Sequence, residues 1–124
     1  MRQKDNLYSI VHMEQTADGY DFQLQLNNQC FIYAAHFPGM PVTPGICLLQ
    51  MAREMLEEAV GRKMKLTEVK NAKFLSVVSP SEDGRLMGLL RKISIDDKGE
   101  VKVQVTMQTE SEVKTKLSIQ CQLA

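Results

Sequence analysis

The stretch HFPGMPVTPGICLLQ, residues 36–50, decides which fold this chain can adopt. It begins with one of the two histidines of the chain and contains three prolines, each of which fixes one φ angle. Gly39 and Gly45 have no side chain, so that backbone or a ligand can approach them closely. The stretch therefore predicts a stiff loop that leads into the start of a buried helix.

One long helix follows this loop, and the residues at its two ends indicate its limits. Thr43 can cap its start, and Pro44 suits the first helical position, where its missing N–H has no partner to lose. Gly61 suits the left-handed residue just past its end. An apolar stripe is formed by Met51, Ala52, Met55, Leu56, Ala59 and Val60, and a polar stripe by Arg53, Glu54, Glu57 and Glu58. Since the first turns are apolar all round, we expect them to be buried and the later turns to be half exposed.

Segments on both sides of the helix alternate apolar and polar residues, which is the period of a half-buried strand. The clearest strands are YDFQLQL (20–26), VKVQVTM (101–107) and VKTKLSIQCQL (113–123). Further candidates are YSIVHME (8–14), LTEVKNAKFLSVV (66–78) and RLMGLLRKISI (85–95). Turn residues separate them at 18–19, 96–99 and 110–112. The pattern predicts a long antiparallel sheet wrapped round one helix, with dimerisation through a sheet edge.

Length and composition predict a single domain, residues 1–124, and exclude some classes of partner. The 15 basic and 15 acidic side chains balance, so the chain lacks the basic excess typical of proteins that bind nucleic acid or anionic membranes. No apolar run approaches the roughly 20 residues that span a bilayer, and no signal-peptide core is seen at the N-terminus.

The three cysteines predict a reducing, cytoplasmic environment. Cys30, Cys47 and Cys121 are odd in number and match no zinc or CxxC spacing, so we expect buried, reduced thiols, with no metal and no cofactor. Cys47 lies near the helix start, which could lower its pKa, but apolar packing is the favoured interpretation.

The end of the proline loop is the first candidate site. The start of a helix carries a partial positive charge, and its first N–H groups lack intrahelical partners, so Gly45 could present an N–H to an anion or oxyanion. A loop that only connects two elements is the alternative. His36 follows the apolar run FIYAA and is either a packed side chain or a base, whereas His12 lies in a strand with no companion motif.

The motif HFPGMPVTPG resembles the signature of the hot-dog-fold 3-hydroxyacyl-[acyl carrier protein] dehydratases of fatty acid synthesis. That family typically reads G-H-F-P-G-x-P-(I/V)-M-P-G, followed by an apolar stretch and an acidic residue on the central helix. The matching positions here are His36, Phe37, Pro38, Gly39, Pro41, Val42, Pro44 and Gly45. More weakly, residues 27–39 resemble the strand that leads to the histidine, and residues 69–86 the strand after the helix. The resemblance implies an α+β hot-dog fold, a sheet curled round one central helix, usually as a dimer.

The resemblance also implies a reaction. These enzymes remove a proton from C2 of a 3-hydroxyacyl thioester and expel the C3 hydroxyl as water, which needs a base and donors for the thioester oxygen. By the motif, His36 would be the base and the Gly45 N–H would hold the thioester carbonyl. Phe37, Pro44 and Ile46 would contact the substrate, which is carried by acyl carrier protein or coenzyme A. A docking patch for an acidic carrier could include Arg62, Lys63, Lys65, Lys70, Lys73, Arg85, Arg91 and Lys92. An ordinary solvated surface is the favoured interpretation of these basic residues.

The chain departs from the family at the acidic position, where it has Gln50. Glutamine can orient a hydroxyl or a water by hydrogen bonds but cannot supply a proton. Glu54 lies four residues further on the same helix face, about 5.4 Å along the axis, and could reach the site through water. Alternatively, Gln50 only extends the polar stripe. Ala35 replaces the glycine that precedes the family's histidine.

Three functions are compatible with these residues. The first is a dehydratase in which His36 does most of the proton transfer and Gln50 assists. The second is a hot-dog thioesterase, for which Glu54 is the only nearby carboxylate. The third is a non-catalytic acyl-binding protein, or a subunit of a heterodimer whose partner supplies the missing acid across the interface.

Overall fold

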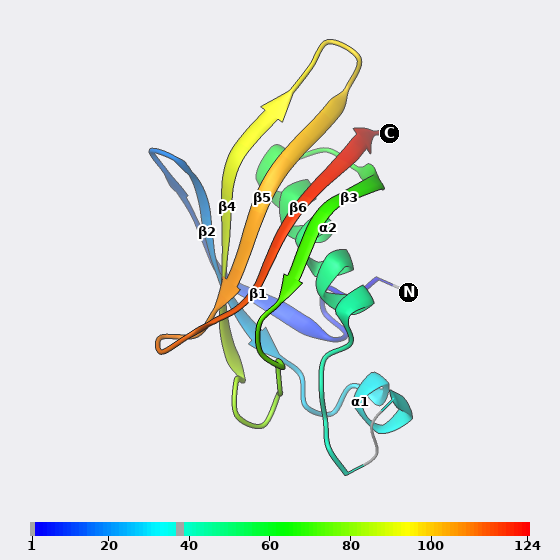
Figure 1. Cartoon of the computed structure of the whole chain (residues 1–124), viewed down its shortest axis with the longest axis vertical. Helices are drawn as coiled ribbons and strands as arrows, with labels where there is room; N and C mark the ends of the chain where they lie inside the picture. Colours follow the sequence, from blue (N-terminus) through cyan, green and yellow to red (C-terminus); the bar gives the residue numbers. More distant parts are fainter. Residues whose placement is uncertain (1, 37–38) are drawn as a thin grey trace.

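One antiparallel sheet and one long helix make up most of the molecule. The computed structural model describes residues 2–36 and 39–124, and only the backbone of His36. The elements are β1 (Tyr8–Thr16), β2 (Gly19–Leu26), α1 (Phe31–His36), α2 (Gly45–Val60), β3 (Met64–Phe74), β4 (Arg85–Ile95), β5 (Glu100–Gln108) and β6 (Val113–Leu123). Six strands form the sheet in the order β1-β2-β4-β5-β6-β3. The sheet curves round α2 (Figure 1), which confirms the expected α+β hot-dog architecture.

The core lies between the concave face of the sheet and α2. From the helix, Met51, Met55 and Leu56 are fully buried. Gly88 on β4 allows the close approach, because a Cβ added there would lie 2.5 Å from the Met55 sulfur. The apolar positions of β2, β4, β5 and β6 complete the core, among them Phe22, Leu24, Leu86, Leu90, Val103, Val105, Met107 and Ile119.

The start of α2 differs from the prediction, while its end confirms it. Pro44 occupies the N-cap position with extended backbone (φ −61°, ψ 146°) rather than the first helical position, and no side chain caps the helix. Thr43 is not the cap, because its hydroxyl instead shares a 3.0 Å hydrogen bond with the Tyr33 hydroxyl. Gly61 adopts the left-handed conformation (φ 78°), and its N–H donates to the Glu57 carbonyl at 2.8 Å.

Burial along α2 follows the pattern only in part, since Cys47 and Leu48 are buried as expected but other residues differ. Ile46 in the first turn is 61% exposed, whereas Glu54 and Glu57 in the third and fourth turns are buried. The reason is the N-terminal segment, residues 2–8, which packs over the polar stripe of the helix and donates hydrogen bonds to it. No described residue packs over Ile46 in the first turn in this way.

The strand predictions hold closely for β4 and β6, whose limits are as expected. β3 ends at Phe74 rather than Val78, because the N–H groups of Leu75 and Ser76 turn to the Lys114 carbonyl (2.9 and 3.1 Å). The predicted strand before the histidine is wrong, since residues 31–36 form the short helix α1.

Local hydrogen bonds explain the helix that replaces this strand. The Asn27 side chain accepts the Gln29 N–H at 3.0 Å, and the Asn27 carbonyl accepts the Cys30 N–H at 3.1 Å, so the chain turns before it can extend. Ile32 and Tyr33 then point into the core, where both are buried.

Two strands, β1 and β3, form the edges of the sheet. Most of β3 is exposed, including Val69 at 40% and Phe74 at 51%. An open edge strand of this length is a ready template for pairing with another chain. Among the described residues, no helix is long and apolar enough to cross a bilayer.

Candidate functional site

The described part of the proline loop, residues 39–44, is fixed by two hydrogen bonds. The Tyr33–Thr43 bond ties it to α1, and the Thr43 N–H donates to the Val78 carbonyl at 2.7 Å. Gly39 has a φ of 83°, which favours glycine at this turn. The start of α2 is thus held between α1 and the segment that follows β3.

An apolar hollow of about 520 Å³ lies beside the start of α2. It is lined by Val42, Thr43, Gly45, Leu48, Phe74, Leu75, Ser76, Val77 and Val78. A Cβ added to Gly45 would lie 3.0 Å from the Phe74 ring, so the glycine leaves room for the ring at this point. Because Phe74, Leu75 and Val77 are each more than half exposed, the hollow can receive an apolar chain from outside.

Two residues near the start of α2, Gly45 and Leu48, line this hollow. The Cys47 and Leu48 N–H groups donate to the Pro44 carbonyl at 3.0 and 3.2 Å. No described residue accepts a hydrogen bond from the Gly45 N–H. Within the described residues this N–H is therefore left to donate to a ligand, and the positive end of the helix dipole favours a carbonyl or anionic oxygen there.

Gln50 lies on the second turn of α2 and is partly buried. The Arg53 Nε–H donates to the Gln50 Oε1 at 2.9 Å. Since arginine can only donate, the contact must involve the amide oxygen, and the amide nitrogen of Gln50 is left to donate elsewhere. The position can therefore bind an acceptor oxygen, but it offers no proton to transfer.

Glu54, one turn further, has a different environment. Its side chain is fully buried, with Oε2 accepting the Gln3 N–H at 2.9 Å and Oε1 accepting the Lys4 N–H at 2.9 Å. The Tyr8 hydroxyl also donates to Oε1 at 3.0 Å. Burial, and next the Glu54 charge, raise the pKa of Tyr8 above its ordinary value, so that it stays a donor. These contacts occupy the carboxylate that we expected to reach toward the site.

The other predicted site residues have varied placements. His36 ends α1, but its side chain and the whole of Phe37 lie outside the described residues, so the His36–Gln50 geometry stays a prediction. Pro44 and Ile46 flank Gly45 at the helix start, with Ile46 on the surface. Burial raises the pKa of the Cys47 thiol, which favours its apolar packing role over a reactive one.

Sequence reasoning missed Phe74 and Val77 as lining residues of the hollow, and Arg53 as the hydrogen-bond partner of Gln50. The first two come from beyond the helix in sequence, and their apolar side chains gave no signal beyond a strand pattern. Arg53 did carry a signal, because it lies three residues after Gln50 and therefore on the same helix face.

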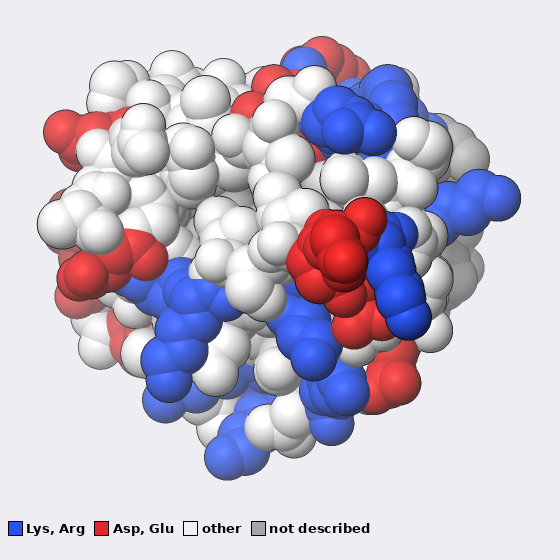
Figure 2. All heavy atoms as spheres, turned by 90° about the horizontal axis from the view of Figure 1, so that it is seen from above, with Lys and Arg blue, Asp and Glu red and all other residues white. Residues whose placement is uncertain are grey.

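The surface does not form a uniformly basic patch. Figure 2 shows lysine and arginine side chains gathered over part of one face with acidic side chains between them. Of the expected docking residues, Arg91 pairs with Asp21 at 2.8 Å and Lys70 with Glu68 at 3.1 Å. These pairs, the first partly buried and the second exposed, reduce the positive field that an acidic carrier would meet.

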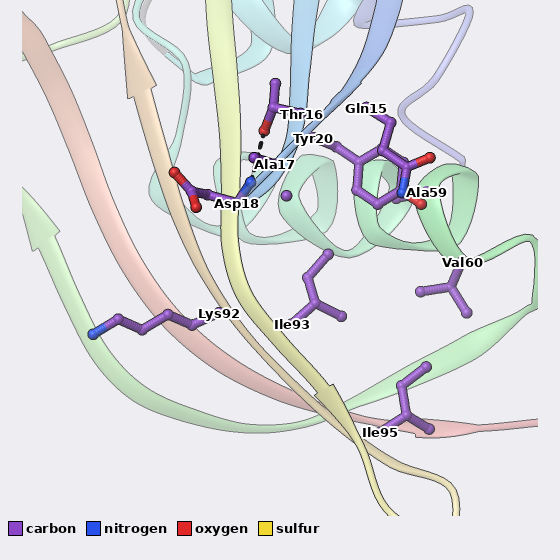
Figure 3. Close-up of a pocket in the computed structure, with 11 residues that line it drawn as sticks. Gln15, Thr16, Ala17, Asp18, Tyr20, Ala59, Val60, Lys92, Ile93 and Ile95 are labelled. Atoms are coloured by element: carbon purple, nitrogen blue, oxygen red, sulfur yellow. Dashed lines mark hydrogen bonds between the residues drawn. The ribbon is translucent and has the colours of Figure 1, made fainter.

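A second hollow, of about 460 Å³, lies at the opposite end of α2. In Figure 3, Ile93 and Ile95 of β4 point toward the helix end at Ala59 and Val60, while the Lys92 side chain extends away. None of the predicted site residues is among the described residues that line it, whereas Gly45 lines the hollow at the start of α2. The hollow beside Gly45 is therefore the better candidate site.

Comparison with known proteins agrees with this geometry. The model of the family described as ApeI-like, ApeI dehydratase, matches residues 12–118. This chain belongs to the ApeI-like family. The 3-hydroxyacyl-[acyl-carrier-protein] dehydratase FabZ of Ligilactobacillus salivarius is 35% identical over 69 residues, which are 50% of this chain and 49% of that protein. FabZ of Clostridium acetobutylicum is 33% identical over 58 residues, 41% of each chain. The matched region thus spans half or less of the length of these curated relatives.

Solved structures show the same fold at low identity. The dehydratase heterocomplex ApeI:P from Xenorhabdus doucetiae has a chain with a TM-score of 0.67 and 20% identity, covering 91% of this chain and 96% of that one. The putative thioesterase yhdA from Lactococcus lactis has a TM-score of 0.70 and 16% identity, covering 100% and 98%. The fold is therefore shared by dehydratases and thioesterases, and the choice of reaction rests on the residues of the site.

Proposed function

We propose that this protein eliminates water from a 3-hydroxyacyl thioester to give a 2-enoyl thioester. The observation that carries the proposal is the motif of residues 36–45, which ends on Gly45 beside an apolar hollow, where its N–H has no acceptor among the described residues. A thioester carbonyl bound to that N–H would leave its acyl chain against Leu48, Phe74 and Val77. Membership of the ApeI-like family supports this reaction over hydrolysis.

Because residue 50 is not an acid, His36 must both remove the proton from C2 and return it to the leaving oxygen. The neutral imidazole takes the proton from C2, and the C–H electron pair moves to the thioester oxygen, where the Gly45 N–H stabilises the negative charge. The electron pair then forms the C2=C3 double bond as the C3–O bond breaks. The leaving oxygen takes the proton back from the imidazolium and departs as water, while the Gln50 amide donates a hydrogen bond to it.

The substrate would be carried by acyl carrier protein or coenzyme A in the cytoplasm, and the active form would be a dimer. The exposed apolar surface beside the site, formed by Ile46, Phe74, Leu75 and Val77, supports a partner subunit there. The open edge of β3 lies next to it in sequence. The partner would be a second copy or, as the name of the ApeI:P heterocomplex states for that assembly, a different subunit.

A matched pair of histidine variants tests the proposal. The purified protein is incubated with a 3-hydroxyacyl thioester and, separately, with its 2-enoyl counterpart, and interconversion is followed by absorbance of the enoyl thioester. We expect His36→Ala to abolish interconversion and His12→Ala, on β1, to leave it unchanged. Interconversion that survives His36→Ala, or release of free thiol instead of enoyl product, would contradict the dehydratase.

A second candidate is a non-catalytic acyl-binding subunit, which Gln50 favours because the position lacks an acid. In that case the protein would bind the thioester without turnover by itself. Adding a partner subunit that has a glutamate or aspartate at the corresponding position would then restore the reaction. Turnover by the isolated chain would exclude this candidate.

A further inference from the structure

We infer that Lys114 is a positioning residue that fixes one wall of the hollow beside Gly45, and thereby sets how much of an acyl chain the hollow covers. This wall segment consists of residues 75–78, which follow β3 and line the hollow. The inference rests on the proposed function, because it takes the ligand of the hollow to be an acyl thioester. It adds to that function a determinant of acyl chain length.

Lys114 is the extra residue of a β-bulge at the start of β6. Its neighbours Thr115 and Val113 pair with two consecutive residues of β5, so Lys114 itself has no partner on that strand. A bulge disrupts the ladder locally and leaves the extra residue free for other contacts. The Lys114 carbonyl accepts the N–H groups of Leu75 and Ser76 at 2.9 and 3.1 Å, which holds the first half of the wall segment.

The side chain of the same lysine holds the turn that follows the wall segment. Its Nζ lies 3.3 Å from the Asp83 Oδ2, and only 6% and 9% of the two side chains are exposed. The Asp83 Oδ2 accepts the Ser79 N–H at 3.0 Å, and the Asp83 N–H donates to the Ser79 carbonyl at 2.7 Å. Because separating a buried ion pair leaves an uncompensated charge, the pair keeps this turn in one place.

One hydrogen bond joins the wall segment to the residues before α2. The Val78 carbonyl accepts the Thr43 N–H at 2.7 Å, and Val78 is buried. Leu75 and Val77, by contrast, are 57% and 60% exposed, so their side chains add little packing that would hold the segment. The position of the wall segment therefore depends on its backbone hydrogen bonds and on the buried ion pair.

The consequence concerns the length of the acyl chain rather than its functional groups. Each CH₂ group that leaves water for an apolar surface strengthens binding about fourfold. A wall segment in a fixed position covers each added CH₂ group, whereas one released at its far end leaves part of the acyl chain in water. We therefore expect Kd to fall about fourfold per CH₂ group in the unmodified protein, and only about twofold once the ion pair is broken.

A series of saturated thioesters measures this dependence without any reaction. Butyryl-, hexanoyl- and octanoyl-coenzyme A have no C3 hydroxyl to eliminate, so their Kd values from isothermal titration calorimetry report binding alone. We expect two variants to flatten the dependence on chain length: Lys114→Met, which keeps the backbone carbonyl, and Asp83→Asn, which keeps an acceptor for the Ser79 N–H. Lys114→Arg retains the charge and should keep most of the dependence. Thermal melting shows which variants retain the fold.

Two further variants are controls. Lys116→Met makes the same substitution two residues further along β6, where the side chain is exposed. Glu112→Gln alters the other partner of the Lys114 ammonium, at 2.7 Å, which is half exposed and has no hydrogen bond to the wall segment among the described residues. Both should leave the dependence on chain length unchanged. An equal flattening in either control would overturn the inference.

Amide hydrogen exchange gives a readout that needs no ligand. In Lys114→Met, the Thr43 and Ser79 amides should exchange about tenfold faster, because their acceptors lie on the released segment and turn. A role confined to β6 would leave the Thr43 amide unchanged. Exchange rates at both amides equal to those of the unmodified protein would contradict the inference.

The outcomes separate this inference from the proposed function. If the saturated thioesters bind with the expected dependence but no 3-hydroxyacyl thioester is converted, the proposed function fails and the inference stands. If conversion occurs but neither Lys114→Met nor Asp83→Asn alters the dependence on chain length, the inference fails and the proposed function stands. Kd values that do not change with chain length in the unmodified protein would also overturn the inference.

Discussion

Gln50 and Glu54 lie one turn apart on the same face of α2, yet their surroundings differ in kind. Glu54 is fully buried and accepts hydrogen bonds from two backbone N–H groups and a tyrosine hydroxyl. Gln50 is only partly buried and has one partner among the described residues, the Arg53 Nε–H. The charged side chain thus lies in the closed environment, and the neutral one keeps a free donor.

This difference shows why a carboxylate near a site cannot be taken for its acid from spacing alone. The lone pairs of Glu54 are used to hold residues 3–8 against the helix, so moving this side chain to a substrate would strip donors from the N-terminal segment. A neutral amide at residue 50 has no such task. We therefore assign Glu54 to stability and keep a role of Gln50 in ligand binding as a proposal, and the predictions below test that division.

The largest expected effect is on stability, from Glu54→Ala. The variant leaves the Gln3 and Lys4 N–H groups and the Tyr8 hydroxyl without their acceptor, and breaking a buried charged network of this kind costs about 3–5 kcal/mol. The measurement is the free energy of unfolding from urea denaturation. Glu54→Gln keeps one acceptor oxygen, so its free energy of unfolding should fall by less than that of Glu54→Ala. A Glu54→Gln protein that is as stable as the original chain but has lost dehydratase activity would make Glu54 the catalytic acid and break the division.

Tyr8→Phe should have the next largest effect. It removes one donor to a buried carboxylate, which corresponds to roughly 1.5–3 kcal/mol of unfolding free energy. The pKa of Tyr8 is raised in the folded protein, so its contribution is fully present below its ordinary pKa of 10.0 and is lost as pH rises above that value. Urea denaturation at pH 8 and pH 11 measures this loss, which should be smaller in Tyr8→Phe. An unchanged pH dependence would show that the folded protein does not raise the pKa of Tyr8.

Much of the fold could be predicted from the sequence, because alternating apolar residues require one buried face. The limits of β4 and β6, and the end of α2 at Gly61, follow from local chemistry and are as expected. What could not be predicted depends on distant segments. The burial of Glu54 requires residues 3–8 to pack on it, and Thr43 bonds Tyr33 instead of capping the helix. The motif predicts where the helix starts. Phe74 is distant from it in sequence and lies beside Gly45 only because β3 ends there in the folded chain.

Gln50→Glu tests the other half of the comparison, which is whether residue 50 takes part in the reaction. We expect it to raise the dehydration rate about tenfold, which is below the ~10²–10⁴-fold range of general acid–base catalysis. The gain is limited because the Arg53 guanidinium would favour the charged form of the new carboxylate. The rate constant kcat for the 3-hydroxyacyl thioester is the measurement. If the chain as it stands is active and Gln50→Glu leaves kcat unchanged or lowers it, the lack of an acid at residue 50 does not limit the reaction.

Gly45→Ala should have the smallest effect on stability and a selective effect on the site. The added Cβ would lie 3.0 Å from the Phe74 ring, but this ring is 51% exposed and can move aside, so we expect a change below about 1 kcal/mol. The same methyl group narrows the hollow and crowds the Gly45 N–H, so kcat/KM for the thioester should fall more than stability does. In Gly45→Ala/Phe74→Ala the ring is gone, and kcat/KM should partly recover. If kcat/KM of the double variant is no higher than that of Gly45→Ala, the Phe74 ring does not limit access to the hollow at the start of α2.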